Sequence, residues 1–131
     1  MDPKEVLKGF NNHFLEFMDD IKLAFPKNKD ISTAYIGLLA LRRANPKLVC
    51  NIWKNNILAY YRDSIEDGNI DYFADKDYSS DFSSGWESVI KKLDSFRKPL
   101  KDLPEKEKVK VVKYLQNLTK LNDLYFKLTA T

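Results

Sequence analysis

Apolar residues recur along this chain at spacings of three and four, the pattern of amphipathic α-helices. The first such run follows Asp2-Pro3, a capping residue and then the residue favoured at the first helical position. It ends at Pro26 and predicts a helix over about residues 3–25. The positions on its apolar face are Leu7, Phe10, Phe14, Phe17, Met18, Ile21 and Phe25.

The same spacing predicts four more helices, and no segment shows the period of two that a strand would require. Asp30 or Ser32 is expected to cap the second helix. Asn45-Pro46 begins the third, and Gly68 ends it. The predicted helices cover about residues 3–25, 31–44, 46–67, 84–97 and 104–128, with one short helical turn at Tyr72–Ala74. The predicted fold class is therefore all-α, a compact bundle of about five helices with no sheet.

The apolar faces of the later helices complete a candidate core. The third helix is expected to bury Val49, Ile52, Trp53, Ile57, Tyr60 and Tyr61, and the last helix Val111, Leu115, Leu118 and Tyr125. The end of the last helix is broader, because TKLNDLYFKL adds Leu121, Leu124, Phe126 and Leu128. A helix that is apolar nearly all round is buried on two sides. This one either threads the centre of the bundle or pairs with another molecule, and the central position is slightly favoured.

Length and composition agree with one globular domain over residues 1–131, of which 44% are hydrophobic and 31% charged. Cys50 is the only cysteine and lies in the apolar run LVCNIW, which indicates a buried structural thiol in a reducing compartment. The chain shows no secretory signal and no apolar run long enough for a membrane span. We therefore expect no membrane association and an intracellular location.

The net charge of +3 is unevenly distributed. Residues 1–69 carry ten basic and nine acidic residues, so this half is nearly neutral. Residues 70–89 carry one lysine and five acids, a local charge of −4. Residues 90–131 carry eleven basic and five acidic residues, a local charge of +6. An acidic joint therefore precedes a basic tail.

The acidic joint, IDYFADKDYSSDF at 70–82, has some features of a calcium-binding loop of the EF-hand type. Counting from Asp75, oxygen-bearing side chains stand at the first, third and fifth positions. The sixth position is Ser80 where the loop needs glycine, and the twelfth is Trp86 where it needs glutamate. We therefore expect no metal here, and interpret the aspartates as caps of local backbone donors or as a surface for a basic partner.

No catalytic constellation is evident. His13, the only histidine, stands three residues before Glu16 on the first helix, so the two side chains are expected to touch. Zinc and iron sites need several histidine or cysteine ligands, and nucleophilic catalysis needs a histidine beside a nucleophile. The four glycines are scattered and form no phosphate-binding loop. We predict a non-enzymatic protein without a cofactor or a small-molecule substrate.

The basic tail presents lysines on one side of the last helix, opposite its apolar positions. They are Lys106, Lys110, Lys113 and Lys120, and Lys91, Lys92, Arg97, Lys98 and Lys101 are near in sequence. Such a patch can contact phosphates, so nucleic-acid binding is an alternative function. The competing interpretation is a solvated lysine face, because acidic residues are interspersed and arginine is scarce.

Four stretches, distributed over most of the chain, resemble sequences of one protein family. They are FNNHFLEFMDDI at 10–21, ALRRANPKLVCNIW at 40–53, YRDSIEDGNIDYFADKDYSSD at 61–81 and KYLQNLTKL at 113–121. Together they resemble an uncharacterised family of small all-helical proteins encoded by large DNA viruses of algae and protists. The resemblance implies a viral origin. It also implies a location in the host-cell cytoplasm or nucleus, or in the virion. It transfers no functional residues, because the shared motifs are helix faces and caps.

The function predicted from these observations is protein–protein interaction, as an adaptor or a virion-associated structural protein of a large DNA virus. Charge opposition between the acidic joint and the basic tail indicates a protein partner or self-association. The expected contact residues are Tyr72, Phe73, Asp75, Asp77 and Tyr78 in the acidic joint, and Leu124 and Phe126 on the last helix. The alternative is a nucleic-acid-binding accessory protein that uses Lys106, Lys110, Lys113 and Lys120.

Overall fold

The computed structural model describes residues 2–75 and 87–130, and within these ranges every regular element is helical. The elements are α1 (Pro3–Ala24), α2 (Lys29–Ala44), α3 (Leu48–Ile52), the π-helical segment η1 (Trp53–Leu58), α4 (Ala59–Glu66), α5 (Ile70–Asp75), α6 (Glu87–Arg97), the 3-10 segment η3 (Lys98–Asp102) and α7 (Glu105–Thr129). The predicted all-α bundle of about five helices is confirmed, with α3, η1 and α4 forming the third helix in sequence order.

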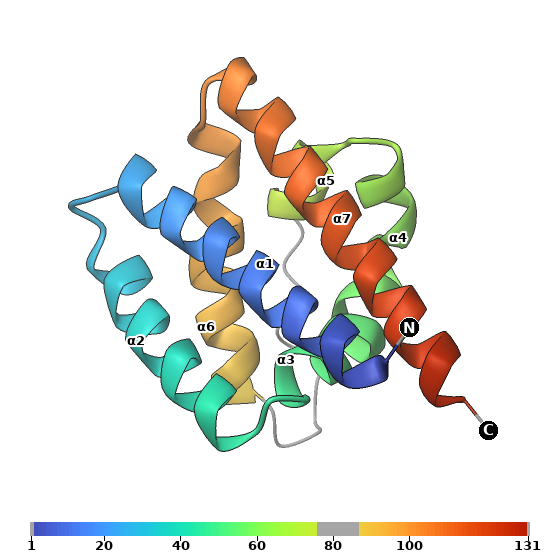
Figure 1. Ribbon diagram of the computed structural model, residues 1–131. Helices are drawn as coiled ribbons and strands as arrows, with labels where there is room; N and C mark the ends of the chain where they lie inside the picture. The colour runs from blue at the N-terminus through green and yellow to red at the C-terminus, as the bar shows by residue number, and fades with distance from the viewer. Residues whose placement is uncertain (1, 76–86, 131) are drawn as a thin grey trace.

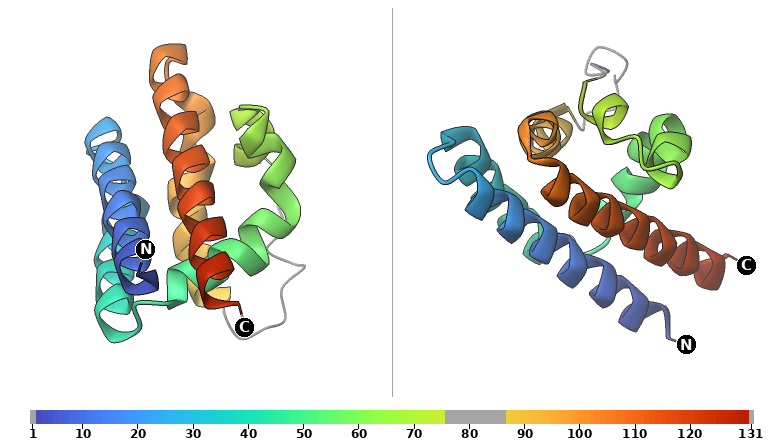
Figure 2. Two further views of the ribbon diagram at one scale, coloured as in Figure 1. Left: turned by 45° about the vertical axis from the view of Figure 1, so that its right-hand side comes forward. Right: turned by 90° about the horizontal axis from the view of Figure 1, so that it is seen from above.

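The helices are arranged around the long pair α1 and α7. Figure 1 shows these two helices side by side and running in opposite directions, so the ends of the chain lie near each other. Helix α2 turns back along α1 and packs on α6, whereas α4 and α5 lie on the other side of α7 (Figure 2). Helix α7 therefore packs against α1 on one side and against η1 and α4 on the other, and its remaining side lies at the surface.

The first two helices begin at side-chain caps. Asp2 Oδ1 accepts a hydrogen bond from the backbone N–H of Lys4 at 2.8 Å, as the Asp2-Pro3 pair predicts. The second helix begins earlier than predicted, because Asn28 rather than Asp30 or Ser32 is its cap. The extended backbone of Asn28 places Oδ1 3.1 Å from the backbone nitrogen of Ile31.

The third predicted helix is interrupted by the π-helical segment η1, which the sequence did not indicate. A π turn holds an extra residue, so the buried face shifts along the chain beyond it. Asn56, Ile57 and Leu58 are buried in succession, and Tyr61 follows them into the core with no exposed surface. The expectation that Tyr60 is also buried was wrong. Beyond η1 it lies off the buried face of α4, and it is 41% exposed.

Gly68 ends this helix as predicted, through a Schellman motif. Its φ of 75° is left-handed, a conformation that glycine adopts without steric cost. The N–H of Asn69 donates to the carbonyl of Ser64 at 2.7 Å, and the N–H of Gly68 donates to that of Ile65 at 3.1 Å. The chain therefore reverses sharply into α5.

Aromatic rings fix α1 against η1 in the core. Phe10 and Phe14 each meet Trp53 edge-on, with ring centroids 6.1 and 6.3 Å apart. Such pairs contribute about 0.5–1.5 kcal/mol each beyond their burial. These contacts hold one side of α1, and its neighbouring side faces α2.

Candidate functional site

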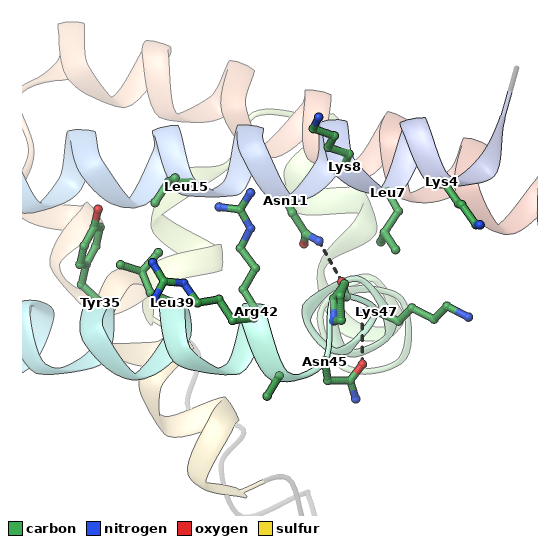
Figure 3. A pocket seen from close by; sticks show the side chains of 13 residues that line it. Lys4, Leu7, Lys8, Asn11, Leu15, Tyr35, Leu39, Arg42, Asn45 and Lys47 are labelled. Carbon is green, nitrogen blue, oxygen red and sulfur yellow. Dashed lines mark hydrogen bonds between the residues drawn. The ribbon is translucent and has the colours of Figure 1, made fainter.

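A groove runs between α1 and α2 and has a volume of about 1000 Å³. Figure 3 shows side chains from both helices converging on it, with Asn45 and Lys47 of the α2–α3 connection at one end. Its apolar lining consists of Leu7, Leu15, Tyr35, Leu39, Ala44 and Pro46. Leu7 is almost fully buried, whereas Leu15, Tyr35 and Leu39 are half-buried, so an apolar floor remains open to solvent.

Five cationic side chains stand around this floor: Lys4, Lys8, Arg42, Arg43 and Lys47. They come together because α2 runs antiparallel to α1 and places its last turn beside the first turns of α1 (Figure 3). None of the five forms an ion pair with a carboxylate among residues 2–75 and 87–130. Among the residues that the structure describes, no Asp or Glu lines the groove.

Hydrogen bonds between the two walls hold the groove in shape. Asn11 Nδ2 donates to the carbonyl oxygen of Pro46 at 2.9 Å, and the Arg42 guanidinium donates to Asn12 Oδ1 at 2.6 Å. Asn11 is 7% exposed, and its bond to Pro46 offsets the cost of burying its amide. The chain's own hydrogen bonds therefore hold the groove in shape.

Tyr35 closes the far end of the groove and is itself fixed. Its hydroxyl donates to Asp19 Oδ1 at 2.6 Å, and Lys22 Nζ lies 4.5 Å from the centre of its ring. The bond to Asp19, followed by burial, raises the pKa of Tyr35 above its usual value of 10. Tyr35 is therefore a neutral donor at physiological pH and its ring is already in contact with a cation.

The titratable side chains in the lining of the groove are three lysines, two arginines and Tyr35. Within residues 2–75 and 87–130, no His, Cys, Asp, Glu or Ser lines it. Its cations can attract carboxylates or phosphates, and its floor can receive apolar side chains. Elsewhere in the described residues, no group of three His, Cys, Asp or Glu side chains is placed to hold a metal ion.

The single cysteine is buried, as expected. Cys50 has no exposed surface, and burial raises the pKa of its thiol to about 12, although a hydrogen bond from Asn122 acts in the other direction. Asn122 Nδ2 donates to the Cys50 carbonyl oxygen at 2.7 Å and to Sγ at 3.1 Å. This pair joins α7 to α3 just before the π-helical segment, and its role is structural.

The predicted contact residues of the acidic joint are only partly placed. Asp77 and Tyr78 lie outside the described residues, and Asp75 ends α5. Tyr72 is 46% exposed, as a contact residue requires. Phe73 is 4% exposed and packs edge-on against Tyr61, with centroids 5.3 Å apart. Phe73 therefore belongs to the core and not to the expected docking surface.

Arg97, which the sequence grouped with the basic patch, is also a core residue. It is 3% exposed, its Nε lies 3.0 Å from Asp94 Oδ1, and its Nη1 donates to the carbonyl oxygen of Phe73 at 2.7 Å. The guanidinium therefore ties α6 to α5, and the ion pair with Asp94 holds the charge inside the bundle.

The predicted contacts at the end of α7 are half-buried. Leu124 and Phe126 pack against the core, and Lys54 Nζ lies 4.3 Å from the centre of the Phe126 ring. Leu128, one turn after Leu124, is 36% exposed. The apolar arc at this end of α7 is thus mostly covered by the chain itself.

The four lysines of the alternative site are exposed on α7. Lys110 Nζ lies 3.2 Å from Asp20 Oδ2, and the same carboxylate accepts a hydrogen bond from the Tyr114 hydroxyl at 2.7 Å. Lys106, Lys113 and Lys120 have no ion pair within the part of the chain that the structure describes. The α1–α7 surface therefore mixes lysines with an acidic partner.

His13 lies at this same surface, and its predicted contact is present. His13 Nδ1 is 3.5 Å from Glu16 Oε2, and its ring packs against Tyr114 with centroids 4.9 Å apart. The side chain is 21% exposed and is partly packed.

The groove was not predicted from the sequence. Lys4 and Lys8 are four residues apart on one helical face, and Arg42, Arg43 and Lys47 form a second short cluster. Each cluster was counted within a nearly neutral half of the chain. Asp2 and Glu5 lie in the same turns as Lys4 and Lys8, so a local charge count finds only the second cluster. The antiparallel packing of α1 and α2 joins the two clusters.

No described helix has the length and apolar character that crossing a membrane requires. No protein-family model, curated protein or solved structure matches this chain.

Proposed function

We propose that this protein is a non-enzymatic adaptor that binds another protein through the groove between α1 and α2. The observation that carries the proposal is the set of five cations without carboxylate partners in the described residues, arranged around an open apolar floor. Apolar anchors supply most of the affinity of a protein interface, whereas charges at its rim steer association and set specificity. The groove offers both features on one surface.

The lining favours a protein partner over a nucleic acid. Surfaces for single-stranded nucleic acids present free aromatic faces on which bases stack. Tyr35 is the one aromatic residue that lines the groove in the described part of the chain, and its ring already contacts Lys22 while its hydroxyl is bound to Asp19. A floor of leucine and proline side chains matches apolar side chains of a protein better than a sugar–phosphate backbone.

The resemblance to small proteins of large DNA viruses adds a setting to this proposal. In that setting the adaptor acts during infection or within the particle, and its partner is a viral or host protein. The proposal for the groove does not depend on this setting, because it rests on the side chains that line the groove.

The proposal is tested by comparing two variants that change the net charge equally. The groove variant is Lys8→Glu with Arg43→Glu, and the control is Lys106→Glu with Lys113→Glu on the exposed side of α7. Each tagged protein is used for affinity capture from nuclease-treated extract of the source cells. The captured partner is then purified, and its binding is measured by calorimetry.

We expect the wild-type protein and the control to bind one purified partner with a defined stoichiometry, and the groove variant to lose it. Circular dichroism checks that both variants remain folded. A partner that binds all three proteins equally would refute the groove as the binding site. A partner that is captured from untreated extract but not from nuclease-treated extract would favour the alternative nucleic-acid function of the lysines on α7. Loss of binding in the control variant and not in the groove variant would also favour it.

A further inference from the structure

We infer that the part of the partner that enters the groove is an amphipathic α-helix with acidic residues concentrated toward one end. This inference rests on the proposed function, which it makes more specific. It follows from the construction of the groove walls, from the distribution of charge along the groove and from its length.

The walls of the groove are two α-helices, whose backbone N–H and C=O groups already bond within each helix. An extended peptide in such a groove would find no sheet edge with which to pair its own backbone. Its polar groups would face leucine side chains, and a buried unpaired backbone group is costly. A helix satisfies its backbone internally and presents only side chains, so it is the conformation that this groove accepts.

Charge is distributed unevenly along the groove. Figure 3 shows Lys4, Lys8 and Lys47 toward one end, Arg42 near the middle, and Leu15, Leu39 and Tyr35 toward the other end. No carboxylate of the described residues lines the cationic end. A bound helix is therefore complementary when its carboxylates lie at the cationic end and its apolar residues continue toward Leu15 and Leu39.

The length of the groove sets the length of the bound helix. The lining residues of α1 run from Lys4 to Leu15, an interval of eleven residues. At a rise of 1.5 Å per residue this is about 16 Å, or roughly three helical turns. Three turns present apolar side chains at positions i, i+3 or i+4, and i+7, which match the floor of the groove.

The test uses three blocked, fluorescein-labelled synthetic peptides of 16 residues. The acidic probe has a leucine stripe at helical spacing and glutamates flanking one end of it. The basic probe has the same stripe with lysine in place of each glutamate. The scrambled probe has the composition of the acidic probe but no stripe. Binding is measured by fluorescence anisotropy, and helix formation in the bound probe by circular dichroism.

The protein variants test the two features of the groove separately. Lys8→Gln with Arg43→Gln removes two cations, and Leu39→Ser removes part of the floor. Lys106→Gln with Lys113→Gln is the control, since both lysines lie on α7 outside the groove. Neutralising substitutions at these exposed or half-exposed positions leave the core contacts intact, and thermal melts check each fold.

We expect the acidic probe to bind the wild-type protein and the control, and to become helical when bound. Removal of the two cations is expected to weaken binding about tenfold, because each exposed pair contributes modestly. We expect the scrambled and basic probes to bind the wild-type protein at least tenfold more weakly than the acidic probe does. The Leu39→Ser variant is expected to bind the acidic probe at least tenfold more weakly than the wild-type protein does. Raising the salt concentration should weaken the binding of the acidic probe, since the charge pairs are exposed to solvent.

Failure of the acidic probe to bind at several hundred micromolar overturns the inference. Equal binding of the acidic and scrambled probes also overturns it, because charge alone would then suffice for binding. Displacement of both probes by a DNA oligonucleotide would favour a phosphate-bearing partner. The proposed function is judged separately. A natural partner that is lost from the Lys8→Glu, Arg43→Glu variant keeps the groove as the docking site even if no helical probe binds.

Discussion

The same substitution, glycine to alanine, is expected to have opposite effects at two positions of this bundle. Gly9 lies inside α1, and a Cβ atom added there meets no atom within 4 Å outside its immediate surroundings. Gly68 ends α4 with a left-handed φ of 75°. A Cβ atom there would lie 3.6 Å from Val112 Cγ1, an ordinary contact, so space is sufficient at both sites.

The magnitudes follow from conformation, because neither site has a steric clash. Alanine in a helix interior is about 0.8–1 kcal/mol more favourable than glycine, mainly because glycine loses more backbone freedom on folding. Gly9→Ala should therefore raise the free energy of unfolding by about 0.8–1 kcal/mol, or roughly 3–5 °C in Tm for a domain of this size. A left-handed backbone costs a residue with a Cβ about 1–2 kcal/mol, so Gly68→Ala should lower the free energy of unfolding by about 1 kcal/mol.

The measurement is urea denaturation followed by circular dichroism at 222 nm for the wild-type protein and both variants. Equal m-values would show that the comparison reflects stability and not a change in the unfolded state. A loss of stability in Gly9→Ala would mean that the surface of α1 at this position is covered. A gain in Gly68→Ala would mean that the residue is not left-handed and that the Schellman motif is absent.

Two further predictions concern buried and hydrogen-bonded polar groups. Asn122→Asp should lower the free energy of unfolding by about 3 kcal/mol or more at pH 7, because a carboxylate would replace a fully buried amide that donates to the Cys50 carbonyl. Burial raises the pKa of that aspartate in the folded state, so the native state binds more protons than the unfolded state. The loss of unfolding free energy, measured by urea denaturation, should therefore be smaller at pH 5 than at pH 7. An equal loss at both pH values would contradict this. Burial and the bond to Asp20 raise the pKa of Tyr114 from 10 to about 12, so the native state holds its proton longer than the unfolded state does. The stability of the wild-type protein should therefore fall between pH 10 and 12, and Tyr114→Phe should reduce that slope; identical alkaline unfolding curves would refute the assignment.

The sequence by itself determined the helices, because the signals that start and stop a helix act within a few residues. Asp2-Pro3 begins α1 and Gly68 ends α4, as their local chemistry requires. The spacing of apolar residues also identified most of the core, including Trp53 and Leu118. Each of these features depends on neighbours in the chain, so no knowledge of packing was needed.

Where local signals compete, the sequence was less informative. Asn28, Asp30 and Ser32 are all capping residues, and the backbone conformation of Asn28 decides between them. The π-helical segment has no sequence pattern of its own, yet it decides that Tyr61 rather than Tyr60 is buried. Such an insertion is stabilised by tertiary packing, and its effect on the buried face appears only in the folded chain.

The tertiary structure alone decided which charges meet. Arg97 belongs to a basic stretch of sequence, but it lies inside the bundle, where it pairs with Asp94 and donates to the carbonyl oxygen of Phe73 in α5. Lys8 and Arg43 are 35 positions apart in a stretch of nearly neutral charge, and they line one groove because α2 folds back along α1. Helix propensity is a local property of the chain, whereas a surface made by two helices depends on contacts between residues distant in sequence. For that reason the fold class could be predicted from the sequence and the groove between α1 and α2 could not.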